Sequence, residues 1–216
     1  MIQSYQTHVP NQTPSMPPHQ DHERRREQIL RAMTAVAVRD GLHSVSMRTV
    51  AAAAGVSLRL VQYYFGSKAA LMRAGLERLE ARGMQRWAAR TPADADGQAR
   101  DVLLALFAEA LPVDDERRAF HVLWMAYAVL AMTDAEIPER AFVDGPDRLQ
   151  AHIAATLEHG VAKGQFRADL DIALESVALL GLLHGLGTAV LVGQQRADTA
   201  MAAVAAHLDR LQPDPP

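Results

Sequence analysis

Residues 46–68, SMRTVAAAAGVSLRLVQYYFGSK, carry the signals for two short helices joined by a tight turn. Ser46 and Ser57 are hydroxyl residues of the kind that cap helix N-termini. Between them, Gly55 can adopt the positive φ of a sharp turn. Ala51 has a side chain small enough to let two helices pack closely. Two short helices joined by a glycine-containing turn predict a helix-turn-helix.

The second helix of this motif leaves a polar face that points outward. Arg59 suits a bidentate pair with guanine, Gln62 suits adenine, and Tyr63 suits a phosphate or a thymine methyl group. Lys68 opens the next helix, where free backbone N–H groups favour a phosphate. We therefore predict that this helix enters the major groove of DNA. The predicted DNA contacts are Ser46, Met47, Arg48, Ser57, Leu58, Arg59, Leu60, Gln62, Tyr63, Tyr64 and Lys68. The alternative interpretation is a helical corner that is packed for stability alone.

Charge is distributed unevenly along the chain. Residues 22–73 hold nine Lys and Arg against three Asp and Glu, whereas residues 74–216 hold 13 against 21. A basic end on an acidic body is typical of a protein that presents one end to phosphates. Chance clustering of solvated charges is the alternative.

Helical periodicity recurs along the chain and no alternating strand pattern is present, which predicts an all-α fold. We expect a disordered tail at residues 1–21, a three-helix DNA-binding domain at 22–68, and a helical ligand-binding and dimerisation domain at 69–216. The dipeptide Gly145-Pro146 falls inside one expected helix and can delay its start. The nine expected helices cover residues 22–40, 46–54, 57–64, 69–90, 98–110, 115–133, 141–163, 171–192 and 196–211.

The region from Gly41 to Leu71 resembles the TetR family of bacterial regulators. The matching pattern is Gly41-Leu42, then Ser46-Met-Arg-Thr-Val-Ala-x-x-Ala-Gly-Val-Ser, then Val61-x-x-Tyr64-Phe65-x-Ser67-Lys68-x-x-Leu71. The resemblance implies a three-helix DNA-binding domain, a six-helix ligand domain and a homodimer that usually represses transcription. Gln62 departs from the family pattern, which often has a phosphate-contacting aromatic residue there, so we expect Gln62 to contact a base instead. Four later features are similar to betaine-regulator-like C-terminal domains: residues 115–118, Trp124, residues 132–136 and residues 164–171.

The acidic half of the chain holds candidates for a small-molecule pocket. Such pockets are apolar and aromatic, with a few polar groups that fix the ligand. The candidates are Met84, Trp87, Phe107, His121, Trp124, Met125, Tyr127 and His152. Because aromatic residues at helical spacing are also ordinary core residues, core packing is the alternative for each of them.

The two last helices predict a dimer interface. Small residues four apart allow two helices to approach closely, and helix-turn-helix proteins read two half-sites as dimers. The candidates are Gly181, Leu183, His184, Gly185, Gly187, Val190, Ala203 and His207. Packing within the chain is the alternative interpretation.

Several function classes lack their signals. The chain has no cysteine, no clustered metal ligands and no cofactor-binding motif, and residues 74–216 contain one serine, Ser176, without a nucleophile elbow. We expect no enzyme, no metal and no cofactor. The apolar stretch 177–192 is shorter than the roughly 20 residues of a membrane span and contains His184, so we expect a buried helix, and no signal peptide is apparent.

Together these features predict a cytoplasmic, ligand-responsive transcriptional regulator. We expect a homodimer that represses by binding a palindromic operator and is released by a small-molecule effector. An architectural DNA-binding protein and a ligand-binding module that has lost DNA binding are the competing hypotheses. The large apolar C-terminal half disfavours the first, and the outward Arg48, Arg59, Tyr63 and Lys68 disfavour the second.

Overall fold

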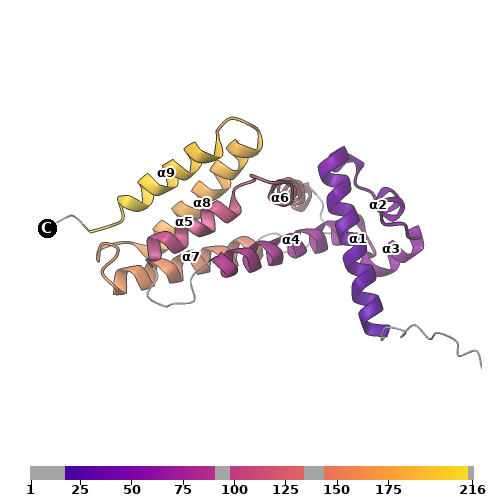
Figure 1. The fold of residues 1–216 in the computed structure, drawn as a ribbon, viewed down its shortest axis with the longest axis horizontal. Helices are drawn as coiled ribbons and strands as arrows, with labels where there is room; N and C mark the ends of the chain where they lie inside the picture. The colour runs from indigo at the N-terminus through magenta and orange to yellow at the C-terminus, as the bar shows by residue number, and fades with distance from the viewer. Residues whose placement is uncertain (1–17, 91–97, 134–143, 214–216) are drawn as a thin grey trace, which may run out of the picture.

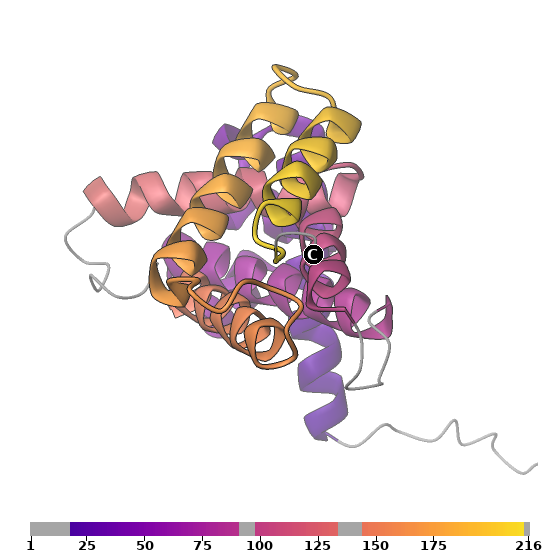
Figure 2. The same cartoon turned by 90° about the vertical axis from the view of Figure 1, so that its left-hand side faces the viewer.

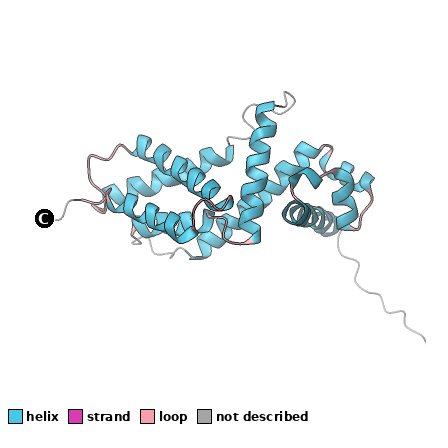
Figure 3. Ribbon diagram, turned by 90° about the horizontal axis from the view of Figure 1, so that it is seen from above, coloured by secondary structure: helices cyan, strands magenta, loops and turns pink. Residues whose placement is uncertain are grey.

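The computed structural model describes residues 18–90, 98–133 and 144–213, and within them the fold is entirely helical (Figure 3). The predicted all-α class and the number of helices are confirmed. The helices are α1 (Pro18–Asp40), the 3-10 helix η1 (Leu42–Ser44), α2 (Met47–Ala54), α3 (Leu58–Phe65), α4 (Lys68–Arg90), α5 (Ala99–Ala110), α6 (Asp115–Thr133), α7 (Asp144–Ala162), α8 (Ile172–Leu191) and α9 (Ala197–Asp209).

The molecule is elongated, with α1, α2 and α3 at one end and α5, α7, α8 and α9 at the other (Figure 1). α4 runs along the molecule between the two ends. α6 is seen end-on in Figure 1 and along its length in Figure 2, so it crosses the direction of α4. α4 packs against α1, α5 and α6, and it therefore connects the two ends mechanically.

Two apolar clusters form the core. The first is centred on α1 to α3, but it also includes Leu79 of α4 and Leu123 of α6, both 2% exposed or less. The second joins α5, α7, α8 and α9, with Phe107, Ile153 and Leu179 fully buried. Because the first cluster continues beyond residue 68, the helix-turn-helix shares its core with the neighbouring helices.

Two helices begin where the sequence did not predict. α1 starts at Pro18, inside the expected tail, and Asp21 in its first turn forms an ion pair with Arg24 at 2.6 Å; residues 1–17 lie outside the described part. α7 starts at Asp144, before Pro146. Proline is tolerated in the first turn of a helix because its missing N–H has no partner there anyway. The predicted breaks at residues 91–92 and 137–138 fall outside the described ranges, as do residues 134–136 of the predicted turn.

α8 matches its expected bounds to within one residue at each end but differs from the expectation in its burial. It spans 20 residues and passes a test of length and apolarity for a membrane span, yet only 22% of its most apolar window is buried inside the protomer. One side, with Ser176, Leu179 and Gly187, packs inward, whereas Leu174 is 68% exposed and Val177 is 54% exposed. The prediction of a fully buried helix was therefore wrong, and this helix presents an apolar face to the outside.

Candidate functional site

The turn between α2 and α3 has the local geometry that the sequence predicted. Ser46 accepts a hydrogen bond from the backbone N–H of Thr49 at 3.1 Å, and its own N–H donates to Oγ1 of Thr49 at 2.9 Å, which forms a capping box. Gly55 lies in the left-handed region at φ 63°, ψ 34°. Ser57 accepts from the N–H of Leu60 at 3.2 Å. The capping box starts α2, the left-handed Gly55 ends it, and Ser57 caps α3 three residues after the last residue of α2.

α3 presents a polar face to solvent. Val61 and Phe65 are buried against α1 and α2, whereas Arg59, Gln62 and Tyr63 are exposed, with Tyr63 75% exposed. The structure thus leaves the predicted base-reading side chains free to meet another molecule. The remaining candidates divide by burial: Arg48, Ser57 and Lys68 are exposed, and Ser46, Met47, Leu58, Leu60 and Tyr64 are half-buried.

Tyr64 lies at the border of this face. Its ring contacts that of His22 in α1 at 4.6 Å between centroids and that of Tyr63 at 5.5 Å. Arg26 lies over the ring of Phe65 at 5.8 Å. The N-terminal half of α1 is therefore held against the end of α3, a tertiary contact that the sequence pattern did not reveal.

Three basic side chains of this face lack an ion partner among the described residues. Within residues 18–90, 98–133 and 144–213, no carboxylate lies within 4.0 Å of Arg48, Arg59 or Lys68, although many other arginines of the protein are paired. Lys68 is the first residue of α4, directly after Ser67, which accepts from the N–H of Ala70 at 3.1 Å. The face therefore combines uncompensated positive charge with a helix N-terminus.

A half-buried ion pair fastens this end of the molecule to α4. Arg78 is 10% exposed and donates to both carboxylate oxygens of Glu27 in α1, at 2.6 and 2.9 Å. The hydrogen bond from Arg78 lowers the pKa of Glu27 below its ordinary value. In addition, the side-chain amide of Gln28 donates to the carbonyl of Ala54 at the end of α2. A movement of α4 is thereby carried to α1 and α2.

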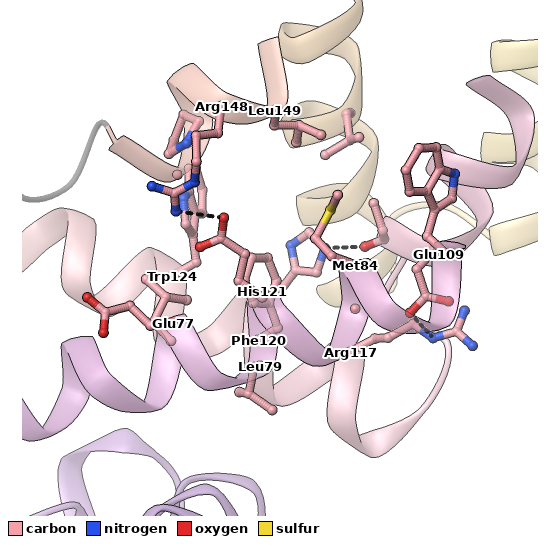
Figure 4. A pocket seen from close by; sticks show the side chains of 18 of the residues that line it. Glu77, Leu79, Met84, Glu109, Arg117, Phe120, His121, Trp124, Arg148 and Leu149 are labelled. Atoms are coloured by element: carbon pink, nitrogen blue, oxygen red, sulfur yellow. Dashed lines mark hydrogen bonds and ion pairs between the residues drawn. The ribbon is translucent and has the colours of Figure 1, made fainter. Parts of the chain in front are cut away.

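The C-terminal part encloses a cavity of about 510 Å³ between α4, α5, α6, α7 and α8 (Figure 4). Six of the eight predicted pocket residues line it: Met84, Trp87, His121, Trp124, Tyr127 and His152. The cavity is in the size range of small-molecule sites in proteins.

Phe107 and Met125 do not line the cavity, which corrects two of the predicted pocket residues. Phe107 is fully buried in the second apolar cluster, while its neighbour Leu106 reaches the cavity. Met125 is 36% exposed on the outer side of α6. Successive helical residues point about 100° apart, so a neighbour of a lining residue faces elsewhere.

The cavity also contains residues that the sequence did not mark as pocket residues. Phe120 lies four residues before Trp124, on the same face of α6, and this spacing is a signal that could have found it. His184, predicted at the dimer interface, lines the cavity and stacks on Trp124 at 4.5 Å. Glu80 of α4 and Arg148 of α7 both line the cavity and form an ion pair at 2.9 Å, which has no local sequence signal; Arg148 is labelled in Figure 4.

The ionised groups of the cavity wall are balanced. Its four arginines, Arg73, Arg86, Arg117 and Arg148, equal its carboxylates Glu77, Glu80, Glu109 and Asp144 in number. Each arginine lies within 4.0 Å of a carboxylate: Arg73 with Glu77 at 3.6 Å, Arg86 with Glu109 at 2.7 Å, Arg117 with Asp114 at 2.9 Å and Arg148 with Glu80 at 2.9 Å. The wall therefore carries no net charge of its own.

Three histidines of the wall have a lowered pKa, which favours the neutral form of the ring. Burial lowers the pKa of His121, His152 and His184 below the ordinary value of 6.5. His121 places Nε2 2.7 Å from the carbonyl oxygen of Ala110. Because a carbonyl only accepts, this nitrogen carries the proton and Nδ1 of the neutral ring is an acceptor.

The predicted dimer residues separate into an outer and an inner set. Gly181, Gly185 and Ala203 are exposed, and a Cβ added to either glycine would meet no atom within 4 Å. In contrast, Leu183 is 4% exposed and Gly187 is buried directly against the ring of His121. The inner pair packs within the protomer, which corrects its assignment to an interface.

The outer side of α8 and α9 is apolar. We call outer face the exposed set Leu174, Val177, Ala178, Gly181 and Gly185 of α8 with Ala202, Ala203 and Ala206 of α9. Val190 is half-buried beside it. His207 is half-buried too and places Nε2 2.5 Å from Oε1 of Glu175, so this histidine bonds within the protomer. In the described ranges, no three His, Asp or Glu side chains are grouped as a metal site.

Comparison with known protein families finds two matches, one in the N-terminal part of the chain and one in the C-terminal part. Residues 29–74 match the bacterial regulatory proteins of the tetR family. Residues 99–213 match the C-terminal domain of BetI-type transcriptional repressors, and this match covers more than half of the chain. The chain belongs to the TetR family. The predicted resemblance is confirmed, including that of the C-terminal half.

Relatives of this TetR-family protein are transcriptional regulators. It is 27% identical to the HTH-type transcriptional regulator PksA of Bacillus subtilis (strain 168) over 79% of this chain and 80% of PksA. A transcriptional regulator from Saccharomonospora viridis, solved in complex with choline, is 26% identical, with a TM-score of 0.73 over 87% of this chain and 95% of that one. The multidrug binding protein EbrR, complexed with imidazole, is 26% identical, with a TM-score of 0.64 over 89% and 97%.

The TetR-family protein is thus a transcriptional regulator with a DNA-binding helix-turn-helix. The families and relatives it matches are regulators and not enzymes, which agrees with the predicted class.

Proposed function

We propose that this regulator is a homodimeric repressor that binds a palindromic operator through α3 and releases it when a small molecule enters the cavity. The observation that carries the proposal is the exposed, unpaired face of Arg59, Gln62 and Tyr63 at one end of a molecule with an aromatic cavity at the other. We place its action in the cytoplasm, where operator DNA is accessible.

The roles of the face follow from its chemistry. Arg59 and Gln62 lie near the start and middle of α3 and suit acceptors on guanine and adenine edges. Arg48 and Lys68 flank α3 and suit phosphates, which position a protein on DNA without reading its sequence. The half-buried Leu58 and Leu60 add apolar contact at most, and Ser46 and Ser57 act chiefly as helix caps.

The dimer is supported by the outer face of α8 and α9. An exposed helix of this apolarity is unusual in a monomer, because large exposed apolar patches mark interaction surfaces. A second copy related by two-fold symmetry would cover it with the same residues. The two α3 helices would then be held at a spacing that matches successive major grooves.

Coupling between the cavity and α3 is supported by contacts of α4. Arg86 of α4 is bonded to Glu109 at the cavity wall, and Arg78, two turns earlier, is bonded to Glu27 of α1. A ligand that prefers one position of α4 would therefore favour one spacing of the recognition helices. Such a ligand acts only through its difference in affinity for the two positions.

Selection of bound fragments from random DNA, followed by mobility-shift titrations on the selected operator, tests the proposal. We expect an inverted repeat. Arg59→Ala should weaken operator binding by about 1–3 kcal/mol and relax one base position. Lys68→Ala should weaken binding to all sequences alike and reduce the dependence of log K on log salt by about one unit.

Arg39→Ala is the matched control, because Arg39 lies in α1 and is paired with Asp40 at 2.6 Å. This variant should bind operator as the parent does. Equal losses of Arg59→Ala on operator and random DNA would contradict base reading. A bound site without inverted symmetry would contradict the dimer.

A further inference from the structure

The charged residues of the cavity wall indicate which chemical class of ligand the cavity binds. Four arginines and four carboxylates line it, and each arginine already has an ion partner within 4.0 Å. Glu77, Glu80 and Glu109 are the partners in three of these pairs, and the remaining lining carboxylate, Asp144, is exposed to solvent. A fully charged ligand would therefore have to lose its hydration without finding an unmatched opposite charge inside the cavity, which is costly. The charge balance therefore favours an uncharged ligand.

Four aromatic side chains, Trp87, Phe120, Trp124 and Tyr127, stand among the aliphatic residues of the wall. His184 stacks on Trp124 with centroids 4.5 Å apart and planes 34° from each other. His152 meets Trp87 edge-on at 4.6 Å. Phe120 lies on the same helix face as Trp124. Aromatic surfaces of this kind hold another flat ring by stacked and edge-to-face contacts.

His121 supplies one polar anchor of defined direction. The bond of its Nε2 to the carbonyl of Ala110 fixes the tautomer, so that the other ring nitrogen is an acceptor. Figure 4 shows His121 among the cavity side chains, with its second nitrogen facing away from that carbonyl. Gly187 of α8 approaches the ring so closely that an added Cβ would collide with Cε1 of His121, so the ring is covered on this side. A fixed, buried acceptor selects a ligand with a matching donor.

We propose that the cavity binds an uncharged compound with a flat ring system that donates a hydrogen bond to Nδ1 of His121. The inference rests on the proposed function in taking this cavity as the effector site. It extends that function by naming the class of compound and the residue that accepts its hydrogen bond.

Isothermal titration calorimetry with four probes of one shape tests the inference on the unaltered full-length protein. 2-Naphthol carries the donor, 2-methoxynaphthalene lacks it, 2-naphthoate adds a negative charge, and a 2-naphthylmethyl trimethylammonium ion adds a positive one. We expect 2-naphthol to bind about tenfold more tightly than the methoxy compound, because one buried hydrogen bond is at stake. Both charged probes should bind at least about tenfold more weakly than 2-naphthol.

Two variants test whether Nδ1 of His121 accepts the hydrogen bond that the ligand donates. His121→Phe keeps a ring but removes Nδ1, so 2-naphthol and 2-methoxynaphthalene should bind equally. The matched control, His152→Phe, changes another histidine of the wall and should retain the tenfold preference. If His121→Phe does not fold, the four-probe series on the unaltered protein still tests that the ligand is uncharged and needs a donor.

Three results overturn the inference: equal binding of naphthol and methoxynaphthalene, tighter binding of either charged probe, and no binding of any probe. A mobility-shift assay of operator release with each probe separates the two proposals. Naphthol that binds without releasing DNA would contradict effector release and leave the ligand class standing. A charged probe that binds best and releases DNA would contradict the proposed ligand class and support effector release.

Discussion

Gly187→Ala is expected to destabilise the protein because its new methyl group would fall on a buried ring. A Cβ built on Gly187 lies 2.3 Å from Cε1 of His121, far inside any real contact distance. The ring of His121 is in a residue only 3% exposed and is held by its bond to Ala110 at 2.7 Å. The ring borders the cavity and could shift towards it, but a shift that clears the new methyl group would strain or break that bond.

Three terms set the size of the effect. Alanine is favoured over glycine in a helix by about 1 kcal/mol. Overpacking of a filled site costs about 1–3 kcal/mol, and a broken bond that leaves buried polar groups unpaired costs about 1–3 kcal/mol more. The free energy of unfolding should therefore fall by about 1–5 kcal/mol, with a central value of about 3 kcal/mol.

Urea denaturation followed by circular dichroism measures this change, with Gly83→Ala as the control. Gly83 lies inside α4, away from the outer face, and an added Cβ there meets only Nη2 of Arg86 at 3.8 Å, an ordinary contact distance. Both variants gain the same helix propensity, so their difference isolates the contact with His121. Comparable stabilities of the two variants at equal protein concentration would refute the packing argument.

Three other perturbations test separate parts of the structure. Ser46→Ala removes the capping box of α2 and should lower the free energy of unfolding by about 1 kcal/mol in the same assay; an unchanged midpoint would contradict the role of the cap. Glu27→Gln breaks the pair with Arg78, which lowers the pKa of Glu27 from 4.5, so the stability advantage of the parent should be complete above pH 4.5 and vanish as the pH falls through the lowered pKa. An advantage that is independent of pH in denaturation curves would argue against this linkage. Val177→Glu places a charge on the outer face and should shift sedimentation towards the monomer at micromolar concentration, whereas Val113→Glu, exposed but outside that face, should not; a persistent dimer would exclude Val177 from the interface.

The helix-turn-helix was predictable because its signals are local. Ser46, Gly55 and Ser57 act on their own neighbours in the chain, through caps and one left-handed residue. No distant contact is needed to interpret them, and the structure reproduces the expected turn.

The start of α1 was not predictable in the same way. Residues 18–28 have no apolar periodicity, and the helix there is held by tertiary contacts of His22 and Arg26 with the rings of Tyr64 and Phe65. Partners 39 or more residues away leave no trace in a local pattern. The expected tail was therefore too long by four residues.

The residues of the cavity and of the outer face could not be predicted from hydrophobic periodicity alone. A repeat of three and four residues identifies the inward side of a helix. Phe107 and Leu106 are both buried in the second apolar cluster, but only Leu106 also reaches the cavity. Similarly, Gly185 faces outward and Gly187 inward within one glycine-rich run. That choice depends on how neighbouring helices cross, which single-helix patterns do not contain.

The chain contains two tryptophans, Trp87 and Trp124, and both lie in the wall of the cavity. The intrinsic tryptophan fluorescence of the protein therefore comes only from side chains that border the ligand cavity. A compound that enters the cavity is expected to change the emission maximum or the intensity of this fluorescence, so ligand binding can be followed without an attached dye.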